Sequence, residues 1–228
     1  MEPAPHHRPR IDRRALLTLG AAGVGGWAIG RVLSDTAPVG RDVRASGAVA
    51  GILDDPFAPA IGPAGASLSL AVFSDYRCPA CRHGFAALNA AVAGDGDVRL
   101  LFKDWPIFGA PSVRAARVAL CAARQGIYPR LHHILMTEAG RLDTAQLRGA
   151  VVEAGGDWTR VEADLTAHGA EIDAQLTRHA AEAASIVLPG TPGYLAGSLL
   201  VVGVIDEAAF ARLFAAARRG GSPGVKEG

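Results

Sequence analysis

The sequence predicts an α/β fold, and three observations lead to that prediction. Residues 68–73 and 98–103 are apolar runs of strand length, and the segment between them has apolar residues at helical spacing. Two strands joined by a helix form a βαβ unit, which we expect to be parallel and right-handed. Residues 112–186 show helical periodicity only, and residues 194–202 contain two short strand patterns that indicate a hairpin. We therefore expect one α/β domain with an additional block of helices.

Composition limits the classes of protein to consider. Half of the 228 residues are hydrophobic, which is enough to form one good core. The net charge is +1 and aromatic residues make up only 6% of the chain, which argues against a nucleic-acid-binding surface. Three cysteines are too few for a small domain held together by disulfides. They suit a redox protein better.

The first 30 residues predict an export signal or an N-terminal anchor. Residues 1–14 contain four arginines, and residues 15–30 carry no charge. Arg13-Arg14, followed by a weakly apolar run, resembles a twin-arginine export signal. A general secretion signal and an uncleaved anchor in the inner membrane are the alternatives. Each of these places the protein in a bacterial cell envelope, in the periplasm or at the inner membrane, where oxidising thiol chemistry is permitted.

The remaining boundaries follow from composition and periodicity. Residues 31–65 are rich in Gly, Pro and Ala and are predicted to be a linker with a short strand near residues 48–53. Residues 66–218 are predicted to form the main domain, with the helical insertion at about 111–186. Residues 219–228 are predicted to be a frayed tail.

The pair of cysteines in Cys78-Pro79-Ala80-Cys81 stands where the first strand gives way to a helix. Unpaired backbone N–H groups and the helix dipole favour an anion at a helix N-terminus, which here would be the Cys78 thiolate. Pro79 fits the first helical turn, where its missing N–H costs nothing. Arg77 and Arg82 add positive potential. We therefore expect Cys78 to be the solvent-facing nucleophile and Cys81 to be buried.

Two other interpretations of the cysteine pair remain open at this point. The pair could form half of a zinc site, but a closed site needs four ligands and the only other cysteine is Cys121. It could be a structural disulfide, although so small a ring would restrict the unfolded chain little. The position between a strand and a helix favours redox chemistry.

Several further stretches give the chain a family resemblance. The Cys78–Cys81 segment resembles the active site of the thioredoxin superfamily, and residues 54–62, 103–109 and 125–132 are similar to stretches of its exported DsbA-like branch. This resemblance implies a thioredoxin-like fold with an inserted helical domain beside the active site. It also implies that Thr191-Pro192 carries the family's cis proline next to the cysteines.

The resemblance implies a function as well. It predicts an exported thiol:disulfide oxidoreductase that exchanges disulfides with cysteine-containing envelope proteins. Cys78 would form the mixed disulfide, Cys81 would resolve it, and Thr191 and Pro192 would hold the client chain. A membrane redox partner would reoxidise or reduce the pair. Neither an organic cofactor nor a metal is expected.

The direction of electron flow and the competing class of function are also predicted. Strong oxidants of this family carry His where this chain has Ala80, and an apolar residue in place of Thr191, so we expect an intermediate reduction potential of about −180 mV. The alternative from another class is a copper-handling module that uses Cys78, Cys81 and a histidine such as His83.

Other polar residues receive structural interpretations. Cys121 lies on the apolar side of a predicted helix and is expected to be a small buried hydrophobe. His179 is expected to pack against the core. Asp75 could cap the end of the strand or carry a proton for Cys81. His132 and His133 lie in a helix without a ligand partner spaced to them, and one of them is expected to face solvent.

Overall fold

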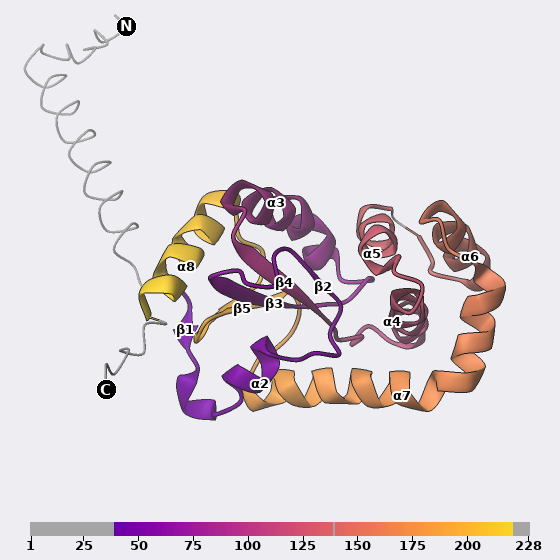
Figure 1. The fold of residues 1–228 in the computed structure, drawn as a ribbon, viewed down its shortest axis with the longest axis horizontal. Helices are drawn as coiled ribbons and strands as arrows, with labels where there is room; N and C mark the ends of the chain where they lie inside the picture. The colour runs from indigo at the N-terminus through magenta and orange to yellow at the C-terminus, as the bar shows by residue number, and fades with distance from the viewer. Residues whose placement is uncertain (1–38, 139, 221–228) are drawn as a thin grey trace, which may run out of the picture. The chain divides into compact units, whose positions relative to one another are not determined.

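The computed structural model describes residues 39–138 and 140–220. The predicted export signal at 1–30 and most of the predicted tail lie outside these residues. Six strands form one sheet in the order β1-β6-β5-β3-β4-β2 (Figure 1). No helix in the described part of the chain is both long and apolar enough to cross a membrane. The strands are β1 (Arg41–Asp42), β2 (Ala60–Ile61), β3 (Leu68–Ser74), β4 (Val98–Asp104), β5 (Gly193–Ala196) and β6 (Leu199–Val202).

The centre of the sheet is the predicted βαβ unit. Strands β3 and β4 pair in parallel, from Leu68 opposite Val98 to Ser74 opposite Asp104, and helix α3 (Pro79–Asp95) connects them. Strands β5 and β6 form the predicted hairpin, and β5 adds antiparallel to the other side of β3. The predicted α/β fold is confirmed.

Helices cover both faces of the sheet. Helix α3 and helix α8 (Glu207–Gly220) lie on one face, whereas α2 (Val49–Leu53) and the C-terminal part of α7 (Trp158–Ser185) lie on the other (Figure 1). Because side chains alternate along a strand, β3 contributes to two cores. Leu70 and Val72 face the first core, and Ala71 and Phe73 face the second.

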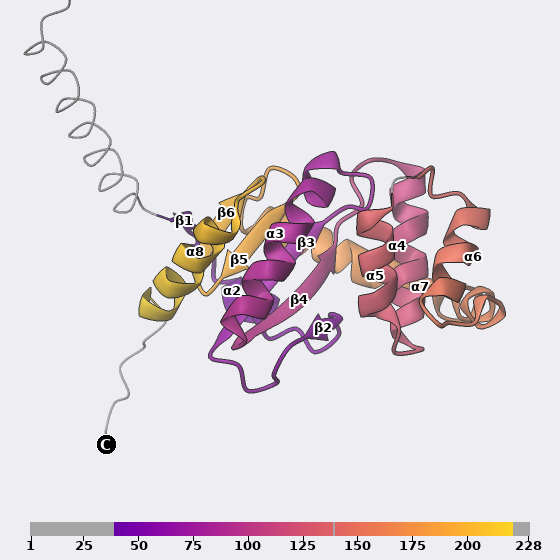
Figure 2. The same cartoon turned by 90° about the horizontal axis from the view of Figure 1, so that it is seen from above.

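The helical insertion is present as expected. It begins with α4 (Ala110–Ala123) and ends with α7, and its first three helices lie beside the sheet (Figure 2). Asp143 and Asp157 start α6 and α7, since their carboxylates accept backbone N–H groups of the first turn at 3.0 Å and 2.8 Å. The two helices between α4 and α7 are α5 (Tyr128–Thr137) and α6 (Thr144–Glu153).

The structure differs from the linker prediction over residues 39–65. Strands β1 and β2 pair with β6 and β4, and residues 49–53 form a helix rather than a strand. Ile52 and Leu53 are buried under the sheet, which fixes this segment to the fold. At Gly62, φ is +94° and a Cβ would collide with the carbonyl of Val98, so a glycine is required there.

Candidate active site

Cys78 and Cys81 lie at the start of α3, as predicted. Cys78 is the N-cap residue, and its Sγ accepts the N–H of Cys81 at 3.4 Å, in the place of a capping oxygen. Pro79 occupies the first turn of the helix. Both cysteines are free thiols. Contrary to expectation, Cys78 is as buried as Cys81, at 2% and 4% exposed, so position at the helix end and not exposure distinguishes them.

The loop before β5 brings Thr191 and Pro192 against this pair. The Thr191–Pro192 peptide bond is cis, and the Thr191 carbonyl accepts the thiol hydrogen of Cys78 at 3.3 Å. The Pro192 carbonyl in turn accepts the N–H of Gly203 at 2.8 Å, which holds the loop against the end of β6. The four predicted site residues therefore meet in space although the two pairs are 110 positions apart along the chain.

Asp75 has the geometry of a loop anchor. Its carboxylate accepts the backbone N–H groups of Arg77 at 2.7 Å, Ile107 at 2.7 Å and Phe108 at 2.9 Å. These bonds tie the loop after β4 to the loop that carries Cys78. Of the two roles considered for Asp75, capping is the one that its contacts support.

The anchored loop gives the site an apolar rim. Ile107 and Phe108 are 43% and 45% exposed, although both are large hydrophobic residues. The Arg77 side chain reaches the Phe108 carbonyl at 3.5 Å, so the rim lies beside the residues that precede Cys78. An apolar rim of this kind can contact the side chains of an extended protein segment.

The Cys81 thiol is hard to ionise in this environment. Desolvation, together with the neighbouring Cys78, raises the pKa of Cys81 to about 12. Cys81 therefore stays protonated at neutral pH until a nearby group removes its proton. A resolving cysteine in this state needs a proton acceptor.

A buried polar cluster near the cysteines was missed by the sequence analysis. The Tyr76 hydroxyl lies 2.9 Å from His132 Nδ1, and the Tyr128 hydroxyl donates to Asp104 Oδ2 at 2.9 Å. Desolvation raises the pKa of Asp104 to about 7 and lowers the pKa of His132 to about 3. His133, by contrast, is exposed, as expected for one of the two histidines.

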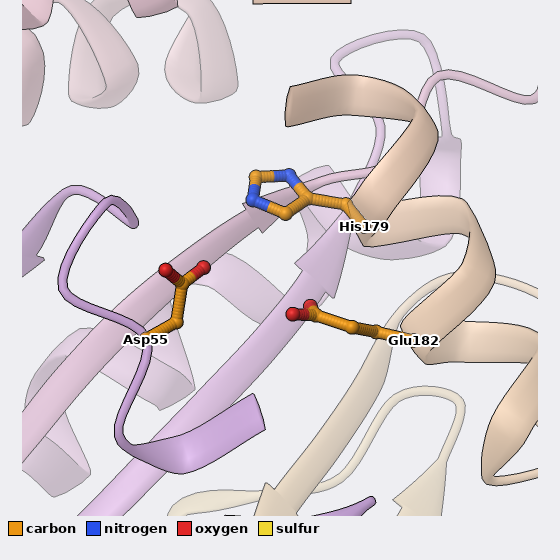
Figure 3. Close-up of side chains that lie close together, drawn as sticks. All are labelled: Asp55, His179 and Glu182. Carbon is orange, nitrogen blue, oxygen red and sulfur yellow. The ribbon is translucent and has the colours of Figure 1, made fainter. Parts of the chain in front are cut away.

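A second polar cluster occupies the opposite face of the sheet. Asp55, His179 and Glu182 point toward one another, with possible ligand atoms within 4.8 Å (Figure 3). The Lys103 ammonium already lies between the carboxylates, at 2.7 Å from Asp55 and 2.8 Å from Glu182. A metal ion would have to displace this ammonium group. We therefore interpret the cluster as a buried ion-pair network.

The two carboxylates of this network differ in acidity. For Asp55, desolvation acts to raise the pKa, but hydrogen bonds from Lys103 and the Phe57 N–H lower it on balance. For Glu182, desolvation outweighs the effect of Lys103, so its pKa is raised. The Lys103 ammonium nevertheless contacts both carboxylates at similar distances.

The remaining predictions concern Cys121 and the metal alternative. Cys121 is fully buried in α4, as predicted, and desolvation raises its pKa to about 11. His83 is exposed and does not join the cysteines. Among the residues that the structure describes, the group around His179 is the only one in which three possible ligands converge. His179 itself is buried, as expected, with Nδ1 3.1 Å from the Asp104 carbonyl.

A cysteine pair at the start of a helix, beside a cis proline and on a mixed sheet, defines a thioredoxin-like protein. Comparison with known families agrees with this assignment, since the family described as "DSBA-like thioredoxin domain" matches residues 69–215. The chain belongs to the DSBA-like thioredoxin family.

Solved structures show the same fold. A thioredoxin-like oxidoreductase from Silicibacter pomeroyi is 31% identical, with a TM-score of 0.71 over 75% of this chain and 97% of that chain. The catalytic domain of Proteus mirabilis ScsC is 22% identical, with a TM-score of 0.69 over 78% of this chain and 99% of that one. The thiol-disulfide exchange protein α-DsbA2 from Wolbachia pipientis is 21% identical, with a TM-score of 0.70 over 76% and 96%. At these last two identities the likeness concerns the fold.

Curated relatives are longer than this chain. A protein named Na(+)/H(+) antiporter NhaA 1 from Mycolicibacterium vanbaalenii is 28% identical over 205 residues, which make up 85% of this chain. A protein of the same name from Mycolicibacterium gilvum is 27% identical over 199 residues. The chain spans about a third of the length of these relatives, 31% in both cases.

Proposed function

We propose that this chain is an exported thiol:disulfide oxidoreductase that exchanges disulfides with cysteine-containing proteins through Cys78 and Cys81. The observation that carries the proposal is the position of the Cys78 sulfur. It lies at the N-terminus of α3, 3.3 Å from the carbonyl that precedes the cis proline, with Cys81 one helical turn later. This arrangement supports nucleophilic attack by Cys78 and resolution by Cys81.

The exchange takes place in two steps. In the reducing direction, the Cys78 thiolate attacks a client disulfide, forms a mixed disulfide and releases the first client sulfur as a thiolate. Cys81 then loses its proton and attacks the Cys78 sulfur, which breaks the mixed disulfide and releases the second client sulfur with the electron pair of that bond. The oxidising direction is the reverse. In this proposal the Thr191 carbonyl and the rim of Ile107 and Phe108 hold the client chain during both steps.

The proposed location is the cell envelope, and the proposed partners are envelope proteins with cysteines and a membrane redox partner. Two observations support this part of the proposal. The first is the predicted export signal in residues 1–30. The second is the likeness to a periplasmic thioredoxin-like protein from Salmonella enterica serovar Typhimurium, which is 25% identical with a TM-score of 0.63.

Trapping of mixed disulfides tests the proposal. Cys81→Ser removes the resolving sulfur and should accumulate mixed disulfides with envelope proteins, whereas Cys78→Ser should accumulate none. Cys121→Ser is the matched control, because it removes the third cysteine and leaves the pair intact, and it should behave like the wild type. Reduction of insulin disulfides by the purified protein should require both Cys78 and Cys81.

Two results would contradict the proposal. Equal trapping by the Cys81→Ser and Cys78→Ser variants would show that the roles of the two cysteines are not distinct. Stoichiometric retention of Cu(I) by the cysteine pair, together with no disulfide exchange, would instead favour the copper-handling alternative.

A further inference from the structure

The buried polar cluster around Asp104 forms a chain of hydrogen bonds that leads toward Cys81. When His132 Nδ1 carries the proton, it donates to Tyr76, whose hydroxyl donates to Tyr128 at 3.4 Å. The Tyr128 hydroxyl donates to Asp104 Oδ2. The 3.4 Å step is long for a hydrogen bond between hydroxyls, but Tyr76 as well as Tyr128 lowers the pKa of Asp104, so both hydroxyls lie near its carboxyl group. Each donor in this chain is therefore oriented toward Asp104.

A small cavity lies between the His132 end of this chain and Cys81. Its volume is about 10 Å³, which is close to the space that one water molecule occupies. Cys81, His132, Ser74 and Pro192 are among the residues that line it. Within the described residues the buried Ser74 hydroxyl has no hydrogen-bond partner. A water in the cavity would supply that partner and would lie between the Cys81 thiol and the imidazole.

We propose that Asp104 is the acceptor for the proton of Cys81, and that the proton travels through this cavity, His132 and the two tyrosines. This inference rests on the proposed function, because it concerns the step in which Cys81 resolves a mixed disulfide. It assigns a role to Asp104 that is distinct from that of Asp75, whose carboxylate is engaged by three backbone N–H groups.

The step is balanced in atoms and electrons. As the Cys81 sulfur attacks Cys78, its proton passes to the cavity water, and the water gives a proton to His132 Nε2. Nδ1 releases its proton to Tyr76, and a hydroxyl proton of the tyrosine pair passes to Asp104. The client sulfur leaves as a thiolate, the Cys78–Cys81 bond forms and Asp104 becomes a neutral acid. When the disulfide is later reduced, Asp104 returns the proton to Cys81 by the same route.

The ionisation behaviour of the groups agrees with these roles. The pKa of His132 is about 3, lowered by desolvation and by His133, so the imidazole passes a proton on and does not store it. The pKa of Asp104 is about 7, raised by desolvation and by Asp75 and lowered by the tyrosines, so this carboxyl can accept and release a proton near neutral pH. The pKa values of Tyr76 and Tyr128 are raised well above 10, so both hydroxyls keep their protons overall.

The groups around Cys81 complete the electrostatic environment. Cys78 and Tyr194 face its sulfur from the helix start and from β5, and the Thr191 carbonyl accepts the thiol hydrogen of the neighbouring Cys78. His179 contacts the Asp104 backbone carbonyl from α7. The described residues place no Lys or Arg in an ion pair with Asp104, so its charge depends on pH and on the two tyrosines.

An assay with two phases of thiolate release measures the attack by Cys81 separately from the attack by Cys78. The reduced protein, in excess, is mixed with 5,5′-dithiobis(2-nitrobenzoate) in a stopped-flow instrument. Attack by Cys78 releases the first coloured thiolate at a rate that depends on protein concentration. Attack by Cys81 on the resulting mixed disulfide releases the second coloured thiolate at a rate that does not depend on protein concentration. The second rate constant is then measured between pH 5 and pH 9.

The wild-type second phase should accelerate with pH with an inflection near pH 7, where Asp104 ionises. Asp104→Asn should slow this phase roughly 10²-fold and remove the inflection, because the amide cannot accept a proton. Tyr128→Phe interrupts the chain and should also slow the second phase. The first phase should be unchanged in both variants. Asp55→Asn, a buried aspartate on the opposite face of the sheet, is the matched control and should retain the wild-type inflection.

A wild-type rate and inflection in both Asp104→Asn and Tyr128→Phe would overturn the inference. If Asp104→Asn fails to fold, judged by near-ultraviolet circular dichroism, Tyr76→Phe and Tyr128→Phe decide the matter, since each removes only one hydroxyl. Failure of the proposed function gives a different result. In that case even the wild type would release no second thiolate from a Cys78 mixed disulfide.

Discussion

Replacing Asp104 with Asn should change the way in which the free energy of unfolding depends on pH. The Asp104 carboxyl has a pKa of about 7 in the fold, against 3.8 for an ordinary aspartate, because burial disfavours its charged form. The folded state therefore prefers the protonated acid. The stability that this preference contributes is largest below the unfolded pKa and is lost as the pH rises through the folded pKa.

The size of the effect follows from the size of the pKa shift. A shift of about three units corresponds to about 4 kcal/mol at 1.36 kcal/mol for each unit. Between pH 4 and pH 8 the wild type should thus lose about 4 kcal/mol of unfolding free energy that Asp104→Asn does not lose. The full value applies because the carboxyl is buried. Solvent would reduce the value for an exposed group, because it screens the charge.

Urea denaturation of both proteins at pH 4, 6 and 8 measures this difference. Relative to the wild type, the variant should be more stable at pH 8 than it is at pH 4. Asp97→Asn is the control, because hydrogen bonds from Ser67 lower the pKa of the exposed Asp97, so its contribution to stability is lost only below about pH 4 and its difference from the wild type should stay nearly constant from pH 4 to pH 8. A difference between wild type and Asp104→Asn that stays constant from pH 4 to pH 8 would refute the reasoning, since it would mean that Asp104 titrates alike in the folded and unfolded states.

Four further predictions follow from the same structure and sequence. Equilibration with glutathione should give the Cys78–Cys81 couple a potential of about −180 mV, and a value near the −270 mV of thioredoxin would contradict the predicted intermediate potential. Native alkylation should leave Cys121 unlabelled until the protein is unfolded, because the thiol is fully buried; rapid labelling would exclude that placement. Lys103→Met should lower the unfolding free energy by about 3–5 kcal/mol, because it leaves two carboxylates without their buried cation; a loss below 1 kcal/mol in urea denaturation would argue against the network. Changing Arg13 and Arg14 to Lys should retain the precursor in the cytoplasm, whereas unchanged secretion in a cell-fractionation assay would indicate the general route.

The elements that were predictable from the sequence are those that carry a periodic pattern. Strands β3 and β4 and the long helices of the insertion repeat apolar residues over many positions, so their type was clear. Strands β1 and β2 have two residues each, which is too short for any period to show. Their pairing depends on the partner strands, and the Gly- and Pro-rich sequence around them suggested a linker instead.

The residues of the candidate site also divide into those that were predictable from the sequence and those that were not. The cysteine pair is a local motif, and the resemblance supplied Thr191 and Pro192. The polar chain behind the pair has no local signature, because Tyr76, Asp104 and His132 come from three separate segments and meet only in the folded protein. An aspartate at the end of a strand is ordinary in sequence. Its distinctive feature, burial without an ion-pair partner among the described residues, becomes visible only when the neighbouring elements are in place.

The two last residues of β4 show why burial of a charge does not by itself indicate function. Lys103 and Asp104 are adjacent, both are buried and, because side chains alternate along a strand, they face opposite sides of the sheet. Lys103 meets two carboxylates on the α7 side, so its charge is compensated and the cluster fixes the structure. On the cysteine side Asp104 meets hydroxyl groups, which can orient a proton but cannot neutralise a charge. A buried acid in that situation exchanges its proton near neutral pH, and Cys81 is the buried thiol nearby that has to lose one.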